Sequence, residues 1–180
     1  HKPPILSISD LSRFSRLYFT GAAGNVAAGK YNDGSPEMRP VLTARVAEAM
    51  RKAWQATKKT PLTAADVERR VEPVELPPSP NLDAGALQKT LADENAKESD
   101  RLSAASKLAY LGRAKNGYPV ELSCLRLNGV YVLHMPGELF VEYQRAAQQL
   151  RPNDVVCMAA YGQYGTGYIG TEIAYGQGGY

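Results

Sequence analysis

The sequence predicts a mixed α/β fold in which a sheet containing an antiparallel hairpin is flanked by helices. Two apolar runs at residues 120–127 and 130–135 are joined by Asn128-Gly129, the favoured two-residue hairpin turn. Apolar residues recur at helical spacing in residues 37–57 and 138–150. Strand-like and helical segments alternate without an internal repeat or a low-complexity linker. The 180 residues are therefore expected to form a single unit.

The first part of the chain is expected to hold a short strand, a loop and a long helix. Residues 17–20 form the expected strand, which a glycine-rich loop follows. The helix covers residues 37–57 and begins just before Pro40, because proline fits only in a first turn. Six residues at helical spacing form its predicted buried stripe: Leu42, Val46, Ala49, Met50, Ala53 and Trp54.

The remaining elements complete the alternation of strands and helices. A strand is expected at residues 67–76, where Pro77-Pro78 ends it. Residues 83–115 are rich in alanine and charge, which predicts an outer helix or a helical pair. After the hairpin, a helix is expected at residues 138–150 and a buried strand at residues 155–160.

Composition argues against several classes of protein. The formal charge is only +3 and the basic residues are scattered, so nucleic-acid binding is not expected. No apolar run is long enough to cross a membrane, and the segment His1-Lys2-Pro3-Pro4 is not a signal peptide. Cys124 and Cys157 each lie in an apolar run, which favours reduced core thiols over a disulfide.

A glycine-rich segment, residues 24–31, spells most of a phosphate-binding loop. That loop needs a serine or threonine after its lysine and a helix that presents free amides to the phosphate. Here Tyr31 stands at the hydroxyl position, and Asn32-Asp33-Gly34 interrupts the chain where the helix must begin. A structural glycine loop beside a site is therefore favoured over a nucleotide site.

Histidine is too sparse in this chain to build a histidine-rich zinc site. The sequence holds only His1 and His134, and no pair has metal-binding spacing. His134 comes four residues before Glu138, at the end of a predicted strand. A histidine hydrogen-bonded to the backbone at a sheet edge is the favoured interpretation.

A carboxylate followed by a tyrosine-glycine tract is the strongest candidate for a site. Glu138 follows Pro136-Gly137 at a strand end, and the tract covers residues 161–180. Glycine lets the backbone approach a ligand closely, and phenols can act as hydrogen-bond donors or metal ligands. The alternative is a glutamate favoured by the dipole at a helix N-terminus, followed by a tyrosine-rich core loop. The residues alone leave both interpretations open.

Three segments resemble the neutral/alkaline (non-lysosomal) ceramidases. Phe19-Thr20-Gly21-Ala22-Ala23-Gly24-Asn25-Val26 is similar to their glycine-rich segment. Leu133-His134-Met135-Pro136-Gly137-Glu138 resembles their strand that ends in a Pro-Gly-Glu-type motif. Tyr168-Ile169-Gly170-Thr171, with Tyr175 and Tyr180 beyond it, resembles their tyrosine tract. These segments span residues 17–180, although residues 60–115 add little.

The resemblance implies a zinc-dependent amide hydrolase that cleaves an N-acyl lipid, such as ceramide, into a fatty acid and an amine base. Carried over by position, Glu138 and Tyr168 are the implied zinc ligands, and Tyr180 is the implied oxyanion donor. Gly24 and Asn25 then belong to a loop at the substrate pocket. A dication can hold a phenol as phenolate and acidify a bound water, so these roles are chemically coherent.

The chain also departs from the family pattern. The metal histidines and the catalytic arginine of the family lie upstream of the glycine-rich segment and have no counterpart here. Many members carry Gly-Asp where this chain has Gly24-Asn25, and the sequence stops at Tyr180, inside the last motif. Residues 1–180 are thus expected to be the later part of a larger catalytic domain, cut at both ends and inactive alone.

Two expectations about partners follow from this interpretation. The remaining zinc ligands would lie outside this segment, and the remainder of the domain or a second chain would cover part of its sheet. The resemblance also implies a secreted or membrane-associated protein. The alternative to an enzyme is a non-catalytic binding domain on the same scaffold, which uses the tyrosine-rich loop as its binding surface.

Overall fold

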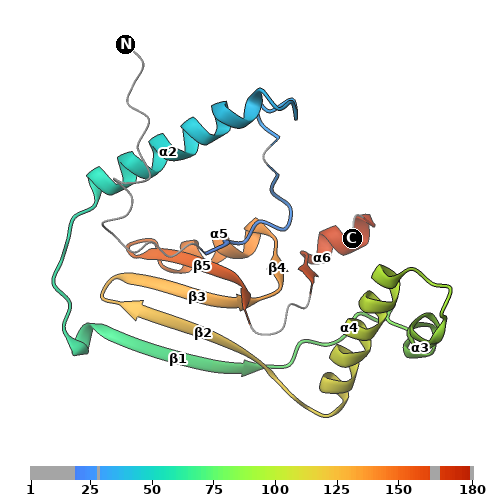
Figure 1. The fold of residues 1–180 in the computed structure, drawn as a ribbon. Helices are drawn as coiled ribbons and strands as arrows, with labels where there is room; N and C mark the ends of the chain where they lie inside the picture. Colours follow the sequence, from blue (N-terminus) through green and yellow to red (C-terminus); the bar gives the residue numbers. More distant parts are fainter. Residues whose placement is uncertain (1–18, 28, 163–166, 179–180) are drawn as a thin grey trace.

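The computed structural model describes residues 19–27, 29–162 and 167–178, and it confirms the mixed α/β class (Figure 1). Helices alternate with strands along the chain, as expected. The helices are α2 (Met38–Ala56), η1 (Ala64–Asp66), α3 (Ala84–Ala92), α4 (Glu98–Lys115), α5 (Val141–Leu150) and α6 (Glu172–Gln177). The strands are β1 (Val67–Val74), β2 (Val120–Leu127), β3 (Val130–Pro136), β4 (Glu138–Leu139), β5 (Val155–Gly162) and β6 (Tyr168–Ile169).

The main sheet has four strands in the order β1-β2-β3-β5. β1, β2 and β3 are antiparallel neighbours, and the predicted hairpin forms with Leu127 opposite Val130. Asn128 takes a φ of 54°, a left-handed conformation that asparagine tolerates better than most residues. β5 then pairs with β3 in parallel, after a crossover through α5. The sheet is therefore mixed.

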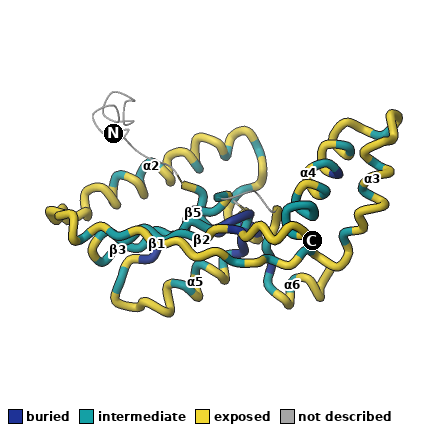
Figure 2. Tube along the Cα trace, turned by 90° about the horizontal axis from the view of Figure 1, so that it is seen from below, coloured by how far each residue is buried: buried dark blue, intermediate teal, exposed yellow. Residues whose placement is uncertain are grey.

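The core lies between this sheet and α5. Its centre consists of Ala22, Leu139 and Met158, with Leu133 and Ala147 packed against it. Figure 2 shows α5 on one side of the sheet and α2 on the other, with buried residues concentrated near β5. One face of the sheet is thus covered, and this is the face that carries the core.

Helix α2 has the predicted bounds to within one residue at each end, but its predicted buried stripe is wrong. None of its residues is buried, and Val46, Met50 and Trp54 are 60%, 50% and 47% exposed. The helix lies apart from the sheet (Figures 1 and 2). Helical spacing identifies which residues share a face, but burial also needs a neighbour, and no described element packs closely on this face.

Of two further expectations, the helical pair is confirmed and the first strand is not. Residues 83–115 form the helical pair α3 and α4, and Tyr110 of α4 donates a hydrogen bond to the Leu76 carbonyl at 2.7 Å. Of the strand expected at residues 17–20, the first two residues lie outside the described part. Phe19 and Thr20 are not in a strand, although the Thr20 carbonyl accepts from the Ala160 amide at 2.8 Å.

The two cysteines are free, but only one is near the core. Cys124 is half-buried, whereas Cys157 is exposed, so the prediction that both are core thiols is wrong for Cys157. The two lie on opposite faces of the sheet because side chains alternate along a strand, and α5 packs on the face that carries Cys124. Among the described residues, no helix has both the length and the apolar character needed to span a bilayer.

Candidate functional site

Glu138 lies outside the helix in which it was predicted. Gly137 has a φ of +61°, and this turn directs Glu138 and Leu139 into the short strand β4. Helix α5 begins only at Val141, with Phe140 as its N-cap. The helix expected from residue 138 is therefore wrong at its start. The interpretation of Glu138 as a glutamate in a first helical turn is wrong for the same reason.

β4 pairs with β6 in parallel, and the register places Glu138 opposite Tyr168. The Glu138 amide donates to the Gly167 carbonyl at 2.8 Å, and the Phe140 amide donates to the Ile169 carbonyl at 3.1 Å. Paired strands lie about 4.8 Å apart, and residues at the same register position point to the same face. The two implied zinc ligands are thus brought together from positions 30 residues apart.

The glycine-rich loop packs directly on β4. The Gly24 amide donates to the Leu139 carbonyl at 2.9 Å. A Cβ atom on Gly24 would lie 2.7 Å from the Glu138 carbonyl oxygen and 3.0 Å from Cδ1 of Phe140. Only glycine permits this approach without a shift of the backbone. The loop that the resemblance places at a substrate pocket therefore lies beside Glu138. Its glycine allows close contact with the backbone of β4.

Asn25 fixes the start of α5 from a distant part of the sequence. Its Oδ1 atom accepts from the Val141 amide at 2.9 Å, and its Nδ2 atom donates to Oε2 of Glu142 at 2.8 Å. Phe140 offers no side-chain cap, so Asn25 satisfies one of the free amides at this helix end. An aspartate would keep the acceptor but could not donate to Glu142.

Two tyrosines hold the loop that follows Tyr168. Tyr143 donates to the Gly170 carbonyl at 2.9 Å, and the Gly170 amide donates to the Tyr175 hydroxyl at 3.1 Å. Burial raises the pKa of Tyr143, and Tyr175 adds to the shift, so the Tyr143 hydroxyl stays protonated as a donor. The helical spacing of residues 138–150 gave no signal for this role of Tyr143. Tyr164 and Tyr180 lie outside the described residues.

His134 has a side-chain partner in place of the expected backbone partner. Its Nδ1 atom lies 3.3 Å from the Ser123 hydroxyl, and its ring meets Phe19 edge-on at 6.3 Å. β3 is an interior strand, between β2 and β5, so the prediction of a sheet-edge histidine is wrong. Both contacts of the His134 ring are thus with neighbouring protein side chains.

The phosphate-loop interpretation also loses its structural basis. Tyr31 has a φ of 59°, and no helix begins until Met38. The loop over residues 31–35 therefore presents no helix N-terminus directly after Lys30. An anion here would lack the helix amides and dipole on which such loops depend.

Within the described part of the chain, no three His, Cys, Asp or Glu side chains are grouped as a metal site. Among the implied zinc ligands, the described residues supply Glu138 and Tyr168. A catalytic zinc site usually has three protein ligands, so this pair alone would leave the site incomplete. Comparison of the chain with protein-family models, with curated proteins and with solved structures found no match.

Proposed function

We propose that this chain supplies two oxygen ligands, Glu138 and Tyr168, to a zinc-dependent hydrolase that cleaves the amide of an N-acyl lipid. The observation that carries the proposal is their shared register position in the β4–β6 pair. Two residues implied as ligands on sequence resemblance alone lie side by side through backbone pairing that the sequence did not predict.

The two side chains suit a zinc ion, and they leave its coordination incomplete. Carboxylate oxygen is a common zinc ligand, and a phenol binds once a nearby dication has lowered its pKa. Glu138 is half-buried, and the Tyr168 side chain is about half exposed, at 48%, so a substrate can reach this face. Further ligands would come from other residues of the full-length protein or from a second chain.

When bound, zinc would acidify a water molecule and polarise the scissile carbonyl. The residues of this chain would hold the ion and orient its surroundings. Tyr143 and Tyr175 fix both backbone groups of Gly170, two residues after Tyr168, and so limit the positions that the Tyr168 phenol can take. Tyr180, as oxyanion donor, would contribute about 3–4 kcal/mol to transition-state stabilisation.

The first test is made on the full-length natural protein. Its intact mass and zinc content are measured together, then again for Glu138→Gln and Tyr168→Phe. We expect about one zinc per chain, its loss in both variants, and a fall of at least 10²-fold in hydrolysis of an N-acyl lipid. Tyr118→Phe is the matched control, because Tyr118 is exposed and lies outside this site.

Tyr180→Phe separates the roles of the tyrosines. We expect it to keep its zinc and to lose about 10²–10³-fold in kcat, because an oxyanion donor acts only in the transition state. Unchanged zinc content in both Glu138→Gln and Tyr168→Phe would refute the ligand assignment.

The alternative is a non-catalytic binding domain. Tyr161, Tyr168 and Tyr175 are each about half exposed, and tyrosine is a common anchor at interfaces. A full-length protein without zinc and without amidase activity would favour this function. Tyr175→Ala would then weaken partner binding, whereas Tyr118→Ala would not.

A further inference from the structure

A second concave site lies on the α5 side of the main sheet. It is a groove of about 460 Å³, within the range of small-molecule pockets, and none of its lining residues belongs to β4 or β6. Its apolar part is formed by Leu133, Ala147, Leu150 and Val156. Its polar part is formed by Glu68, Arg70, Cys124, Arg126, Tyr131 and Arg151.

The strand register explains why these groups meet. One cross-strand row runs from Glu68 through Arg126 and Tyr131 to Val156. The next row on the same face runs from Arg70 through Cys124 and Leu133 to Met158. Arginine side chains from β1 and β2 thus leave the same face as the apolar residues of β3 and β5. Arg151, at the end of α5, closes the other side of the groove.

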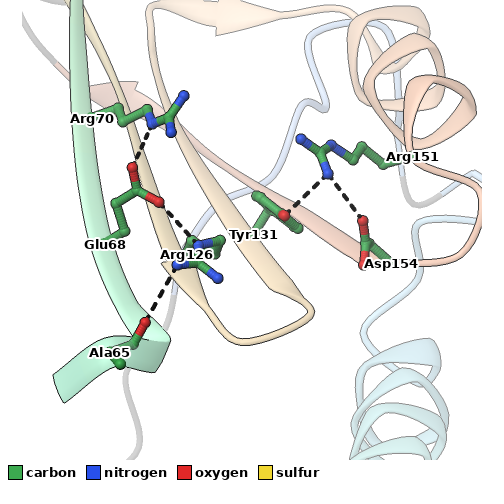
Figure 3. Close-up of polar contacts among 7 residues, drawn as sticks. All are labelled: Ala65, Glu68, Arg70, Arg126, Tyr131, Arg151 and Asp154. Atoms are coloured by element: carbon green, nitrogen blue, oxygen red, sulfur yellow. Dashed lines mark hydrogen bonds and ion pairs between the residues drawn. The ribbon is translucent and has the colours of Figure 1, made fainter. Parts of the chain in front are cut away.

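The arginines of the groove are only partly neutralised. Nε of Arg70 and Nε of Arg126 both bind Glu68, at 2.6 and 3.1 Å. Arg151 binds the Tyr131 hydroxyl at 3.1 Å and Asp154 at 3.4 Å (Figure 3). Three guanidinium groups therefore share two carboxylates, which leaves one net positive charge in this group.

Several guanidinium donors remain available. Each guanidinium has five N–H bonds. Both Nη atoms of Arg70, and the Nε and Nη2 atoms of Arg151, have no acceptor among the described residues. Figure 3 shows the two groups extending toward one another from β1 and from the end of α5. A guanidinium with free edges matches the two oxygens of a carboxylate.

We propose that this groove binds a small organic carboxylate with a short aliphatic chain. The free N–H groups of Arg70 and Arg151 would hold the carboxylate, and Leu133, Ala147 and Val156 would contact the chain. A single net positive charge suits a monoanion, because Glu68 and Asp154 would repel a second negative charge. The site is distinct from the Glu138–Tyr168 pair and does not depend on a zinc ion.

Two cysteines provide a built-in readout of ligand binding. Cys124 lies in the groove beside Arg70, whereas Cys157 lies opposite Val132 on the other face. Burial raises the pKa of the Cys124 thiol, and the Arg151 and Arg70 charges oppose that shift. A ligand in the groove should therefore shield Cys124 and leave Cys157 unaffected.

The test follows alkylation of both cysteines by neutral iodoacetamide, with peptide-resolved mass spectrometry of the full-length protein. Hexanoate is the probe, hexanamide is its neutral analogue, and sodium chloride keeps the ionic strength constant. We expect hexanoate to slow alkylation of Cys124 alone and hexanamide to have no effect. Arg70→Gln and Arg151→Gln should each weaken protection about tenfold or more, since each removes a charged hydrogen-bond donor.

Two control variants distinguish specific recognition of the carboxylate from a general effect of charge. Arg151→Lys keeps the charge but loses the planar donor edge, so hexanoate should protect Cys124 less in this variant than in wild type. Lys107→Gln removes a positive charge from α4, away from the groove, so hexanoate should protect Cys124 as well in this variant as in wild type. Absence of protection by hexanoate would overturn the proposal. Equal protection by hexanamide or by inorganic phosphate would also overturn it, as evidence of an apolar cleft or of unspecific anion binding.

Discussion

The two faces of the four-stranded sheet differ in burial although they are built from the same strands. On the face toward α5, Met158 and Val156 are each 6% exposed. On the opposite face, Val67 and Val155 are 46% and 57% exposed, at the two ends of an entirely apolar cross-strand row. Both faces of the sheet carry apolar residues, and the described residues bury β5 more fully on the α5 face, whereas on the opposite face Ala159, at 3% exposed, is the buried residue of β5.

This difference fits a fold that leaves apolar surface for a partner. Twenty large apolar side chains are exposed among the described residues, and several lie on α2 and on the open face. Under the proposed function, the remainder of the domain or a second chain would pack on this open face.

Neighbouring residues of β5 give the sharpest test of this comparison. Met158→Ala should lower the free energy of unfolding by about 2–5 kcal/mol, because it leaves a cavity beneath α5. Val155→Ala should change it by no more than about 0.5 kcal/mol, because that side chain is mostly exposed. Urea unfolding of the 180-residue chain measures both values.

The same pair of variants in the full-length protein would show whether the open face is covered there. A cost for Val155→Ala that rises toward the cost of Met158→Ala would mean that another part of the assembly packs on this row. Equal costs in the 180-residue chain itself would break the comparison, because both faces would then be buried without a partner.

The covered face also depends on one close backbone contact. Gly24→Ala should destabilise the fold by about 2 kcal/mol, because the new Cβ would meet the Glu138 carbonyl oxygen at 2.7 Å and neither backbone can move freely. Gly29→Ala is the matched control, since nothing lies within 4 Å of its Cβ position. Thermal melts compare the two, and a neutral Gly24→Ala would mean that the loop does not pack on β4.

Asn25 is expected to contribute less than Gly24. Asn25→Ala should cost about 1 kcal/mol, because it removes the only side-chain cap of α5 among the described residues and leaves the Val141 amide to water. Asn81→Ala, in the exposed loop before α3, is the control and should lower the free energy of unfolding by only about 0.3 kcal/mol. A loss in Glu142→Ala as large as that in Asn25→Ala would instead assign the contribution to the second hydrogen bond of Asn25, because alanine removes its acceptor.

Local signals predicted most of the main sheet and its helices. The Asn128-Gly129 turn fixed the hairpin, and helical spacing located α2 within a residue of its bounds. The prediction that one face of α2 is buried was wrong, because periodicity shows which residues share a face and not whether another element packs on that face. β6 and α6 were missed because two and six residues carry too little pattern to identify an element.

The sequence named the residues of the candidate site, which stay a prediction, but it did not predict how they are arranged. Resemblance named Glu138 and Tyr168, whereas their shared register position depends on a parallel pairing of two-residue strands across 30 positions. Local propensity contains no information on such long-range pairing. The role of Asn25 as a cap for α5 and the arginine groove were missed for the same reason, since each joins residues distant in sequence.

The smallest expected effect concerns the charged edge of the covered face. The hydrogen bond from Arg70, with its positive charge and that of Arg126, lowers the pKa of Glu68 below its ordinary value of 4.5. The resulting stabilisation is present above the unfolded-state pKa and is lost as pH falls from about 4.5 through the lower folded-state value. The Arg70 side chain is 80% exposed and that of Glu68 37%, so solvent screens the pair and the effect should be slight. The melting temperature should therefore drop more over this pH range in wild type than in Glu68→Gln. Identical drops would show that the pair contributes nothing measurable to stability.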